Sequence, residues 1–175
     1  MLGPDDLTHS EDIESELQEI RGALFDDKIG VLGPAEAICL GESATVSEAI
    51  ERMLARRQAG VLIVDGDGRL TGIFTERDVL TRVAGPRRDP QKTRLAEVMT
   101  RDPEALTAGD RIAFAVHCMS VAGYRTVPLV NDDRRPIGVV TVNDVIRWLA
   151  GLFPEAVLNL PPGDALKHPH EMDAG

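Results

Sequence analysis

The sequence predicts a mixed α+β fold of two similar units, each with the order strand, helix, strand, strand, helix. Three observations support this prediction. Residues 38–84 and 104–150 align without a gap at a constant offset, which matches Leu40 with Leu106 and Asp78 with Asp144. Apolar residues recur at helical spacing at the same two places in each repeat, and two short apolar runs separated by a turn lie between them. A solenoid is built from more repeats, and from shorter ones, than the two found here. We therefore expect two units related by a pseudo-two-fold axis.

The first unit opens with a predicted strand over Ala37–Leu40. Thr45-x-x-Glu48 is a capping box, and it starts a helix whose apolar face repeats at i, i+3, i+4, i+7 and i+8. The runs Val61–Val64 and Leu70–Thr75 flank the turn Asp65–Gly68, which predicts a hairpin. A second helix follows, because helical spacing returns at Val79, Leu80 and Val83.

The second unit repeats this order. We expect a short strand at Ala105–Leu106 and a helix that ends at Gly123. Strands at Val127–Val130 and Ile137–Thr141 then lead into a helix over Val142–Ala150. The apolar face of the first of these helices carries Ile112, Ala115, Val116 and Met119.

Four segments divide the chain. Residues 1–36 hold an amphipathic helix and a lead-in, with Ser10 as the expected N-cap and Ile13, Leu17, Ile20 and Leu24 on one face. Residues 37–94 form the first unit with a charged, turn-rich linker over 85–94, and residues 95–153 form the second unit. Residues 154–175 are a proline-rich tail, which we expect to be extended.

Charge and composition exclude several classes of protein. The net charge of −10 repels phosphate backbones, and the basic residues form no long run, so we expect no nucleic-acid partner. The longest stretch without a charge, Ile112–Tyr124, is too short to cross a bilayer, and no secretory signal is evident. We therefore expect a cytoplasmic protein in which Cys39 and Cys118 are free thiols.

The repeats resemble a known family. The signal is strand, glycine, strand and Thr-x-x-Asp occurring twice at matched positions, as in Val61-Leu-Ile-Val-Asp-Gly-Asp-Gly-Arg-Leu-Thr-Gly-Ile-Phe-Thr-Glu-Arg-Asp78. The second copy has Met99-Thr-Arg-Asp-Pro103, Tyr124-Arg-Thr-Val-Pro-Leu-Val130 and Gly138-Val-Val-Thr-Val-Asn-Asp144. The pair is similar to a tandem of CBS (cystathionine β-synthase) domains, or Bateman module, over about residues 37 to 152. The resemblance implies binding of AMP, ADP, ATP or related adenosyl ligands between the two units.

Thr75-x-x-Asp78 and Thr141-x-x-Asp144 are the main candidate ligand contacts. Each lies where a strand hands over to a helix, beside backbone N–H groups that have no helical acceptor. An ionised Asp accepts hydrogen bonds from two ribose hydroxyls, while the Thr hydroxyl and the helix N-terminus face a phosphate. The simpler alternative is that Thr is an N-cap and Asp a favourable acid of the first turn.

The two candidate clefts are not equivalent. Arg77 precedes Asp78, whereas Asn143 precedes Asp144, and a guanidinium favours a polyanion more than an amide does. Arg125 stands where the first unit has Ala59, and it could approach base or phosphate from the other unit. The alternative is that both arginines are solvated helix or loop residues. The candidates drawn from the adjoining strand are Thr126, Val127 and Pro128.

Other motifs fail on inspection. Asp65-Gly-Asp-Gly-Arg departs from a calcium loop at its fifth and sixth positions, and Gly66-x-Gly68 lacks the spacing of a dinucleotide fingerprint. His168-x-His170 needs further ligands to hold a metal. No nucleophile or pair of carboxylates stands in a catalytic arrangement. We therefore expect no enzyme, no metal and no required cofactor.

The leading hypothesis is a regulatory module that senses an adenine nucleotide and acts on itself or on an unidentified protein partner. The alternative is a scaffold or dimerisation protein whose clefts have lost their ligand. The resemblance also implies a homodimer, since related modules pair into a disc of four units. The helix residues expected at that interface are Ala49, Met53, Ala115, Val116 and Met119.

Overall fold

The computed structural model describes residues 4–152, and His168, His170 and the predicted tail lie outside them. The predicted fold class of two similar α+β units is confirmed, although the first strand expected in the second unit is reduced to a single bridge. The helical elements are α1 (Pro4–Asp26), η1 (Ile29–Leu32), α2 (Val46–Arg56), α3 (Glu76–Asp78), η2 (Val79–Ala84), α4 (Leu95–Val98), α5 (Ile112–Val121) and α6 (Val142–Leu152). The strands are β1 (Cys39–Gly41), β2 (Gly60–Val64), β3 (Leu70–Thr75), β4 (Thr100–Arg101), β5 (Thr126–Val130) and β6 (Pro136–Thr141).

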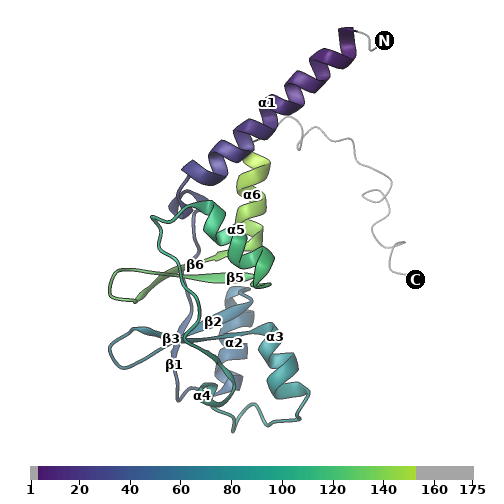
Figure 1. The fold of residues 1–175 in the computed structure, drawn as a ribbon. Helices are drawn as coiled ribbons and strands as arrows, with labels where there is room; N and C mark the ends of the chain where they lie inside the picture. Colours follow the sequence, from purple (N-terminus) through teal and green to yellow (C-terminus); the bar gives the residue numbers. More distant parts are fainter. Residues whose placement is uncertain (1–3, 153–175) are drawn as a thin grey trace, which may run out of the picture.

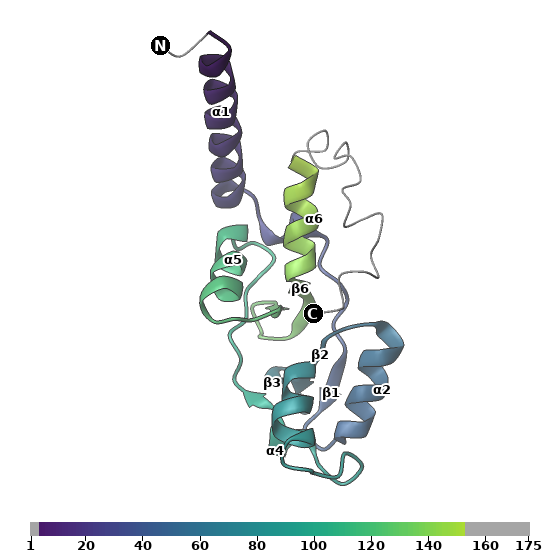
Figure 2. The same cartoon turned by 90° about the vertical axis from the view of Figure 1, so that its right-hand side faces the viewer.

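Two sheets form the centre of the molecule. The first has the order β1-β2-β3-β4, with β1 parallel to β2 and the other pairs antiparallel, and the second is the antiparallel hairpin β5-β6. Helices α2, α3, α5 and α6 lie on one side of the sheets, while the turns of both hairpins project on the other side (Figure 1). Viewed from the helix side, α1 extends beyond the two units alongside α6 (Figure 2).

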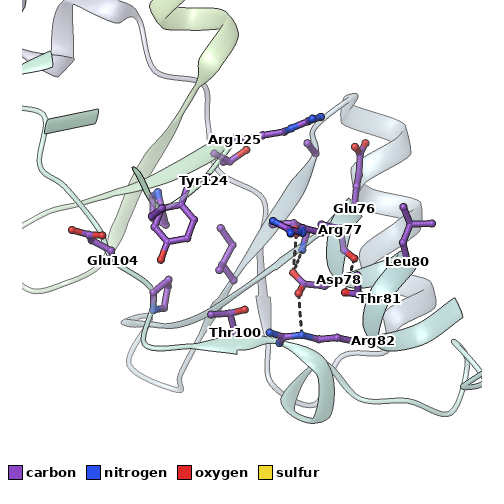
Figure 3. A pocket seen from close by; sticks show the side chains of 18 residues that line it. Glu76, Arg77, Asp78, Leu80, Thr81, Arg82, Thr100, Glu104, Tyr124 and Arg125 are labelled. Carbon is purple, nitrogen blue, oxygen red and sulfur yellow. Dashed lines mark hydrogen bonds and ion pairs between the residues drawn. The ribbon is translucent and has the colours of Figure 1, made fainter. Parts of the chain in front are cut away.

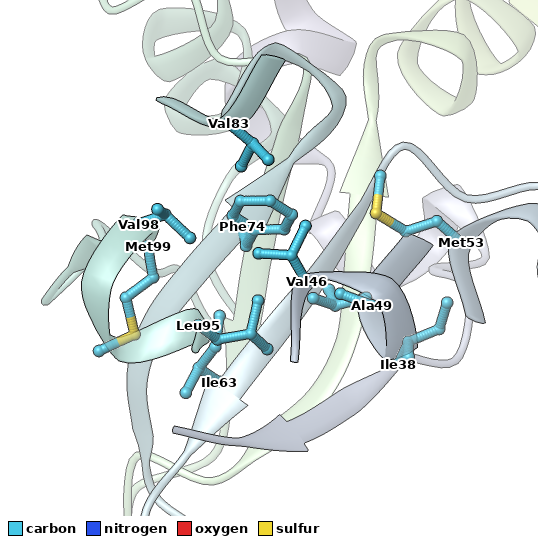
Figure 4. Close-up of a cluster of buried hydrophobic side chains, with 11 residues drawn as sticks. Ile38, Val46, Ala49, Met53, Ile63, Phe74, Val83, Leu95, Val98 and Met99 are labelled. Atoms are coloured by element: carbon cyan, nitrogen blue, oxygen red, sulfur yellow. The ribbon is translucent and has the colours of Figure 1, made fainter. Parts of the chain in front are cut away.

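Each unit has its own apolar core. In the first, Phe74 and Ile63 are fully buried among side chains of α2 and α4 (Figure 4). The Thr45–Glu48 capping box that starts α2 is present as predicted, because the Thr45 hydroxyl accepts from the Glu48 amide and the Glu48 carboxylate accepts from the Thr45 amide. The core of the second unit contains Ile29, Leu32, Ile112, Ala115, Leu129 and Val140.

The segments that precede the two repeats are exchanged between the units. Leu95 and Val98 of α4, which the sequence assigns to the second unit, are buried in the first core. Ile29 and Leu32, which match them at the repeat offset, are buried in the second core. The hydrogen bonds match as well: the Leu95 amide donates to the Ala44 carbonyl at 2.9 Å, and the Ile29 amide donates to the Asp110 carbonyl at 2.8 Å.

Gly72 and Gly138, which match at the repeat offset, allow the exchanged segments to pack closely against the strands. β4 pairs with β3 at Gly72, and Ala35 forms a bridge with Val139 beside Gly138. A Cβ atom at Gly138 would lie 3.0 Å from the Ala35 carbonyl oxygen, and one at Gly72 would lie 3.2 Å from the Thr100 carbonyl oxygen. Both positions therefore favour glycine, because an added side chain would force the crossing backbone to move by a few tenths of an ångström.

The first strand of the second unit is shorter than predicted. Leu106 makes a single parallel bridge to Leu129, whereas β1 makes three pairings with β2. The difference begins at Thr107, whose amide and hydroxyl both donate to the Asp110 carboxylate, at 2.7 and 3.0 Å. This turn ends the extended backbone one residue after Leu106.

The predicted start of the N-terminal helix is wrong. α1 begins at Pro4 rather than after Ser10. Proline is well suited to the first helical position because its missing N–H would have no acceptor there, and Asp5 and Asp6 favour the positive end of the helix. Leu24 packs against the second core, while Leu17 is exposed.

The prediction that Ala49, Met53 and Ala115 lie at the interface between two copies is also wrong. Ala49, Met53 and Ala115 are buried in the cores of their own units, and Val116 and Met119 pack against the second core. A helix on one side of a sheet must use its most regular apolar stripe to cover that sheet, so this stripe is not free for a partner.

The glycine contacts predict the cost of one methyl group. Replacing Gly138 with Ala should destabilise the fold by about 1–3 kcal/mol, because the Ala35 backbone must move away from the added Cβ. Urea unfolding measures the change. The control is Gly41→Ala in β1, where nothing lies within 4 Å of the added atom and the change should be within about 0.5 kcal/mol. Equal stability of the two variants would contradict the close approach.

Candidate functional site

A cavity of about 790 Å³ lies between the two units. One wall comes from the end of β3 and the start of the following helix, and the other from the loop after α5 and the start of β5. The chain that joins the two repeats, residues 85–104 and called the linker from here on, closes a third side through Thr100, Pro103 and Glu104. Because the lead-in of the second repeat packs on the first unit, the cavity exists only where both units and the linker meet.

Asp78 is the buried carboxylate of this cavity, with 8% of the residue exposed. Its Oδ2 accepts from the Thr75 amide at 2.9 Å and from the Thr75 hydroxyl at 2.8 Å. These bonds fix the turn from β3 into the helix, so the N-cap interpretation of Thr75 and Asp78 is confirmed. The same bonds hold the carboxylate at the cavity wall, where an ionised carboxylate offers only hydrogen-bond acceptors.

Arg82 links Asp78 to the linker. Its Nε lies 3.2 Å from Asp78 Oδ1, and its Nη1 donates to the Val98 carbonyl at 2.9 Å. Figure 3 shows Arg82 below Asp78, with Thr100 beside it. A single guanidinium thus joins the carboxylate of the cavity to the segment that connects the repeats.

The second Thr-x-x-Asp has the same local geometry. Asp144 Oδ2 accepts from the Thr141 amide and hydroxyl, both at 2.8 Å, and Asp144 is 9% exposed. Its other oxygen pairs with Arg147 at 3.2 Å, and Trp148 occupies the position that matches Arg82. Thr141, Asn143 and Asp144 do not line the 790 Å³ cavity.

The structure brings six of the ten predicted site residues to one cavity, from both units. Four do not line it: Val127 is buried in β5, and Thr141, Asn143 and Asp144 stand at the matching place of the second unit. The six that line the cavity are Thr75, Arg77, Asp78, Arg125, Thr126 and Pro128.

Sequence reasoning missed several lining residues. Thr100, Pro103 and Glu104 are absent from the prediction because their segment was assigned to the second unit alone. No sequence signal places them opposite Thr75 and Asp78, because their position follows from the packing of this segment on the first unit. Tyr124 also lines the cavity and is next to the predicted Arg125. The sequence feature that could have drawn attention to it is that it is the chain's only tyrosine.

The charges of the cavity are unevenly placed. In Figure 3, Arg77, Asp78 and Glu76 stand on one side, Glu104 on the opposite side, and Tyr124 between them. Arg77 and Arg125 are exposed, and neither forms an ion pair within 4.0 Å among the residues the structure describes. Two free guanidinium groups are therefore available to an anionic ligand.

The two cysteines do not add a reactive group to the site. Cys39 and Cys118 are free, as predicted. Burial raises the pKa of the Cys118 thiol, and the negative charge of Glu104 raises this pKa further, so the nucleophilic thiolate is disfavoured. Within residues 4–152 no three His, Cys, Asp or Glu side chains cluster as metal ligands, and no described helix is long and apolar enough to span a membrane.

Solved structures share this architecture. The CBS domain pair of protein MJ0100, solved in complex with 5′-methylthioadenosine and S-adenosyl-L-methionine, is 25% identical, with a TM-score of 0.64 over 71% of this chain and 97% of that one. The CBS domain protein PAE2072 from Pyrobaculum aerophilum, complexed with AMP, is 22% identical, with a TM-score of 0.64 over 75% and 95% of the two chains. At that lower identity, the likeness concerns the fold.

Several curated relatives are longer proteins. The CBS domain-containing protein CBSCBSPB2 of Arabidopsis thaliana is 32% identical over 115 residues, which are 66% of this chain and 21% of the relative. A homoserine O-acetyltransferase of Methanocorpusculum labreanum is 31% identical over 100 residues, 57% of this chain and 20% of the enzyme. The chain thus spans about a fifth of the length of these relatives.

The family itself is shown by a direct match. The model of the CBS domain matches twice, at residues 35–85 and 95–151, which together are more than half of the chain. These ranges contain both Thr-x-x-Asp turns and both walls of the cavity. The chain belongs to the CBS domain family, and it carries two copies of the domain.

Proposed function

We propose that this chain is a non-catalytic regulatory module that binds an adenine nucleotide, AMP, ADP or ATP, or a related adenosyl ligand in the cavity between its two CBS domains. The observation that carries the proposal is the buried Asp78 carboxylate at the wall of a 790 Å³ cavity. The exposed side chains of Arg77 and Arg125 line the same cavity. Support comes from the related domain pairs, one with AMP and one with 5′-methylthioadenosine and S-adenosyl-L-methionine.

Different residues contact different parts of the ligand. Asp78 accepts from the ribose hydroxyls, since an ionised carboxylate has lone pairs beyond those engaged by Thr75 and Arg82. The exposed Arg77 and Arg125 pair with phosphate oxygens. Because these groups come from both domains, a bound ligand favours one arrangement of the domains over others, which is the basis of regulation.

The alternative is a scaffold whose cavity holds no ligand. The differences between the clefts, Arg77 against Asn143 and Arg125 against Ala59, favour it if they reflect decay of the site. A chain that binds no adenosyl compound and unfolds at the same temperature with and without AMP supports this alternative.

The first test of the site compares its two carboxylates. Asp78→Asn should weaken AMP binding about 10- to 150-fold, because it removes the charge that accepts from the ribose. Asp144→Asn is the matched control, since both carboxylates make the same bonds to their threonine and to one arginine. We expect it to leave the affinity within about 3-fold. Calorimetric titration measures both, and an equal effect of the two changes would show that Asp78 acts only as a helix cap.

The second test concerns the phosphates. Arg77→Ala should weaken ATP about 5- to 10-fold at low salt and adenosine hardly at all, because only the triphosphate loses a charge-assisted partner. The loss should shrink as salt rises. Arg69→Ala, an exposed arginine of the β2-β3 turn, is the control. An equal loss for adenosine and ATP, or no loss for either, would place Arg77 outside the ligand's reach.

We also propose that two copies pair through a different helix surface from the one expected from sequence. Large apolar side chains remain exposed on α2, η2, α5 and α6. Figure 2 shows the molecule from the side on which these helices lie. Such a surface is unfavourable in water and typical of a protein interface. The residues are Leu54 of α2, Leu80 of η2, Val121 of α5 and Ile146 of α6, with between 57% and 73% of each exposed.

Light scattering tests this pairing. The unmodified chain should give about twice the 19.0 kDa of one copy at micromolar concentration. The double change Val121→Lys and Ile146→Lys should give the mass of one copy, since two buried charges at an interface are strongly unfavourable. A single mass for the unmodified chain would rule the dimer out.

A further inference from the structure

Arg134, in the turn between β5 and β6, connects the second domain to the first domain and to the linker. Its Nε donates to the Leu70 carbonyl of β3 at 3.4 Å, and the Leu70 amide donates to the Arg134 carbonyl at 2.9 Å. Its Nη2 forms an ion pair with the Asp102 carboxylate and donates to the Pro103 carbonyl at 3.3 Å. One residue therefore joins three parts of the chain that are far apart in sequence.

The backbone of Arg134 is in a conformation that disfavours arginine. Its φ of 61° lies in the left-handed region, where a Cβ atom crowds the following carbonyl oxygen. Gly68, which matches Arg134 at the repeat offset, has a φ of 79°. The two turns are otherwise alike, because each of these residues donates its amide to the carbonyl three residues before it, at 3.0 and 2.9 Å. The arginine thus carries a backbone cost that glycine avoids, and what it adds in return is its side-chain contacts.

The turn of the first domain cannot make the same contacts. Gly68 has no side chain to offer to the second domain or to the lead-in of the first repeat. Pro136, which matches Leu70, has no N–H, so the backbone bond between Leu70 and Arg134 cannot be repeated either. The clamp at Arg134 is therefore one-sided, and it acts on the linker.

The segment that Arg134 holds forms the third side of the cavity. Pro103, whose carbonyl accepts from Arg134, and the next residue, Glu104, both line the cavity, whereas Arg134 does not. Asp102 lies directly before them, and its amide donates to the Thr71 carbonyl of β3 at 2.9 Å. A shift of this segment would therefore change the shape of the cavity without removing a side chain that lines it.

We propose that Arg134 is a positioning residue that sets the affinity of the cavity by fixing its linker wall, without itself touching the ligand. This inference rests on the proposed function. A wall that is already in place costs the ligand less ordering than one that must be fixed on binding, so the clamp raises affinity. By thermodynamic linkage, a ligand held between this wall and Asp78 stabilises the clamp in return.

The test is the titration of AMP and of adenosine into Arg134→Gly. This change removes the side chain and keeps a residue type that the matching turn carries at a similar φ, so the turn itself should form as before. We expect both ligands to bind about 3- to 10-fold more weakly, by the same factor and at any salt concentration, because a wall and not a phosphate contact has changed. Arg135→Ala removes an equal charge from the same exposed turn and is the control, with both affinities within about 2-fold.

A second variant tests the route through the linker. Asp102→Asn removes the charge that pairs with Arg134, and asparagine tolerates the left-handed φ of 44° at this position. We expect it to weaken both ligands about 2- to 5-fold, and the double variant to bind no more weakly than Arg134→Gly alone. Additive losses in the double variant would mean that the two residues act separately, which contradicts the clamp.

Hydrogen exchange follows the wall without a ligand. The Asp102 amide should exchange about 10-fold faster in Arg134→Gly than in the unmodified chain, and at the unmodified rate in Arg135→Ala. An unchanged exchange rate, an unchanged affinity of folded Arg134→Gly, or a loss confined to AMP overturns the inference, while AMP binding that depends on Asp78 preserves the proposed function. If the unmodified chain binds neither AMP nor adenosine, both proposals fail.

Discussion

The exchange of the two lead-in segments is the constraint on which the rest of this structure depends. Leu95 and Val98 complete the core of the first domain, and Ile29 and Leu32 complete that of the second. Neither domain has a full core without the chain that belongs to the other repeat, so the two should not separate without loss of stability. The exchange also carries Thr100, Pro103 and Glu104 past Asp78, which closes the cavity.

Contacts between the sheets reinforce this arrangement. Leu62 and Leu70 of the first domain are buried against Val130 and Val139 of the second. Arg134, in the β5-β6 turn, donates to the Leu70 carbonyl at 3.4 Å and forms an ion pair with Asp102 of the linker. The linker is thus held at two ends, by Arg134 near Asp102 and by Arg82 at Val98. In the proposed function, a ligand on Asp78 would lie next to Arg82, which also holds the segment that sets the position of the domains, and this contact gives a physical route from occupancy to regulation.

The sequence predicts the elements well and their exchange poorly. Periodicity and capping locate the helices after Thr45 and Thr141 because those signals are local. The destinations of Leu95 and Ile29 depend on contacts between segments far apart in the chain, and no local pattern records them. The same distinction explains the site: Thr75 and Asp78 are recognisable as a motif, whereas Tyr124 and Glu104 become lining residues only through the packing of the second domain on the first.

The central claim is that a nucleotide binds between the two domains, in contact with both. Mapping the amide chemical shifts of the isotope-labelled chain during a titration with AMP tests it most directly. The account predicts that the largest changes occur together at residues 73–78, 100–104 and 122–128, which meet only at this cavity. Changes confined to one of these segments, centred on other parts of the chain, or absent at saturating AMP would contradict it.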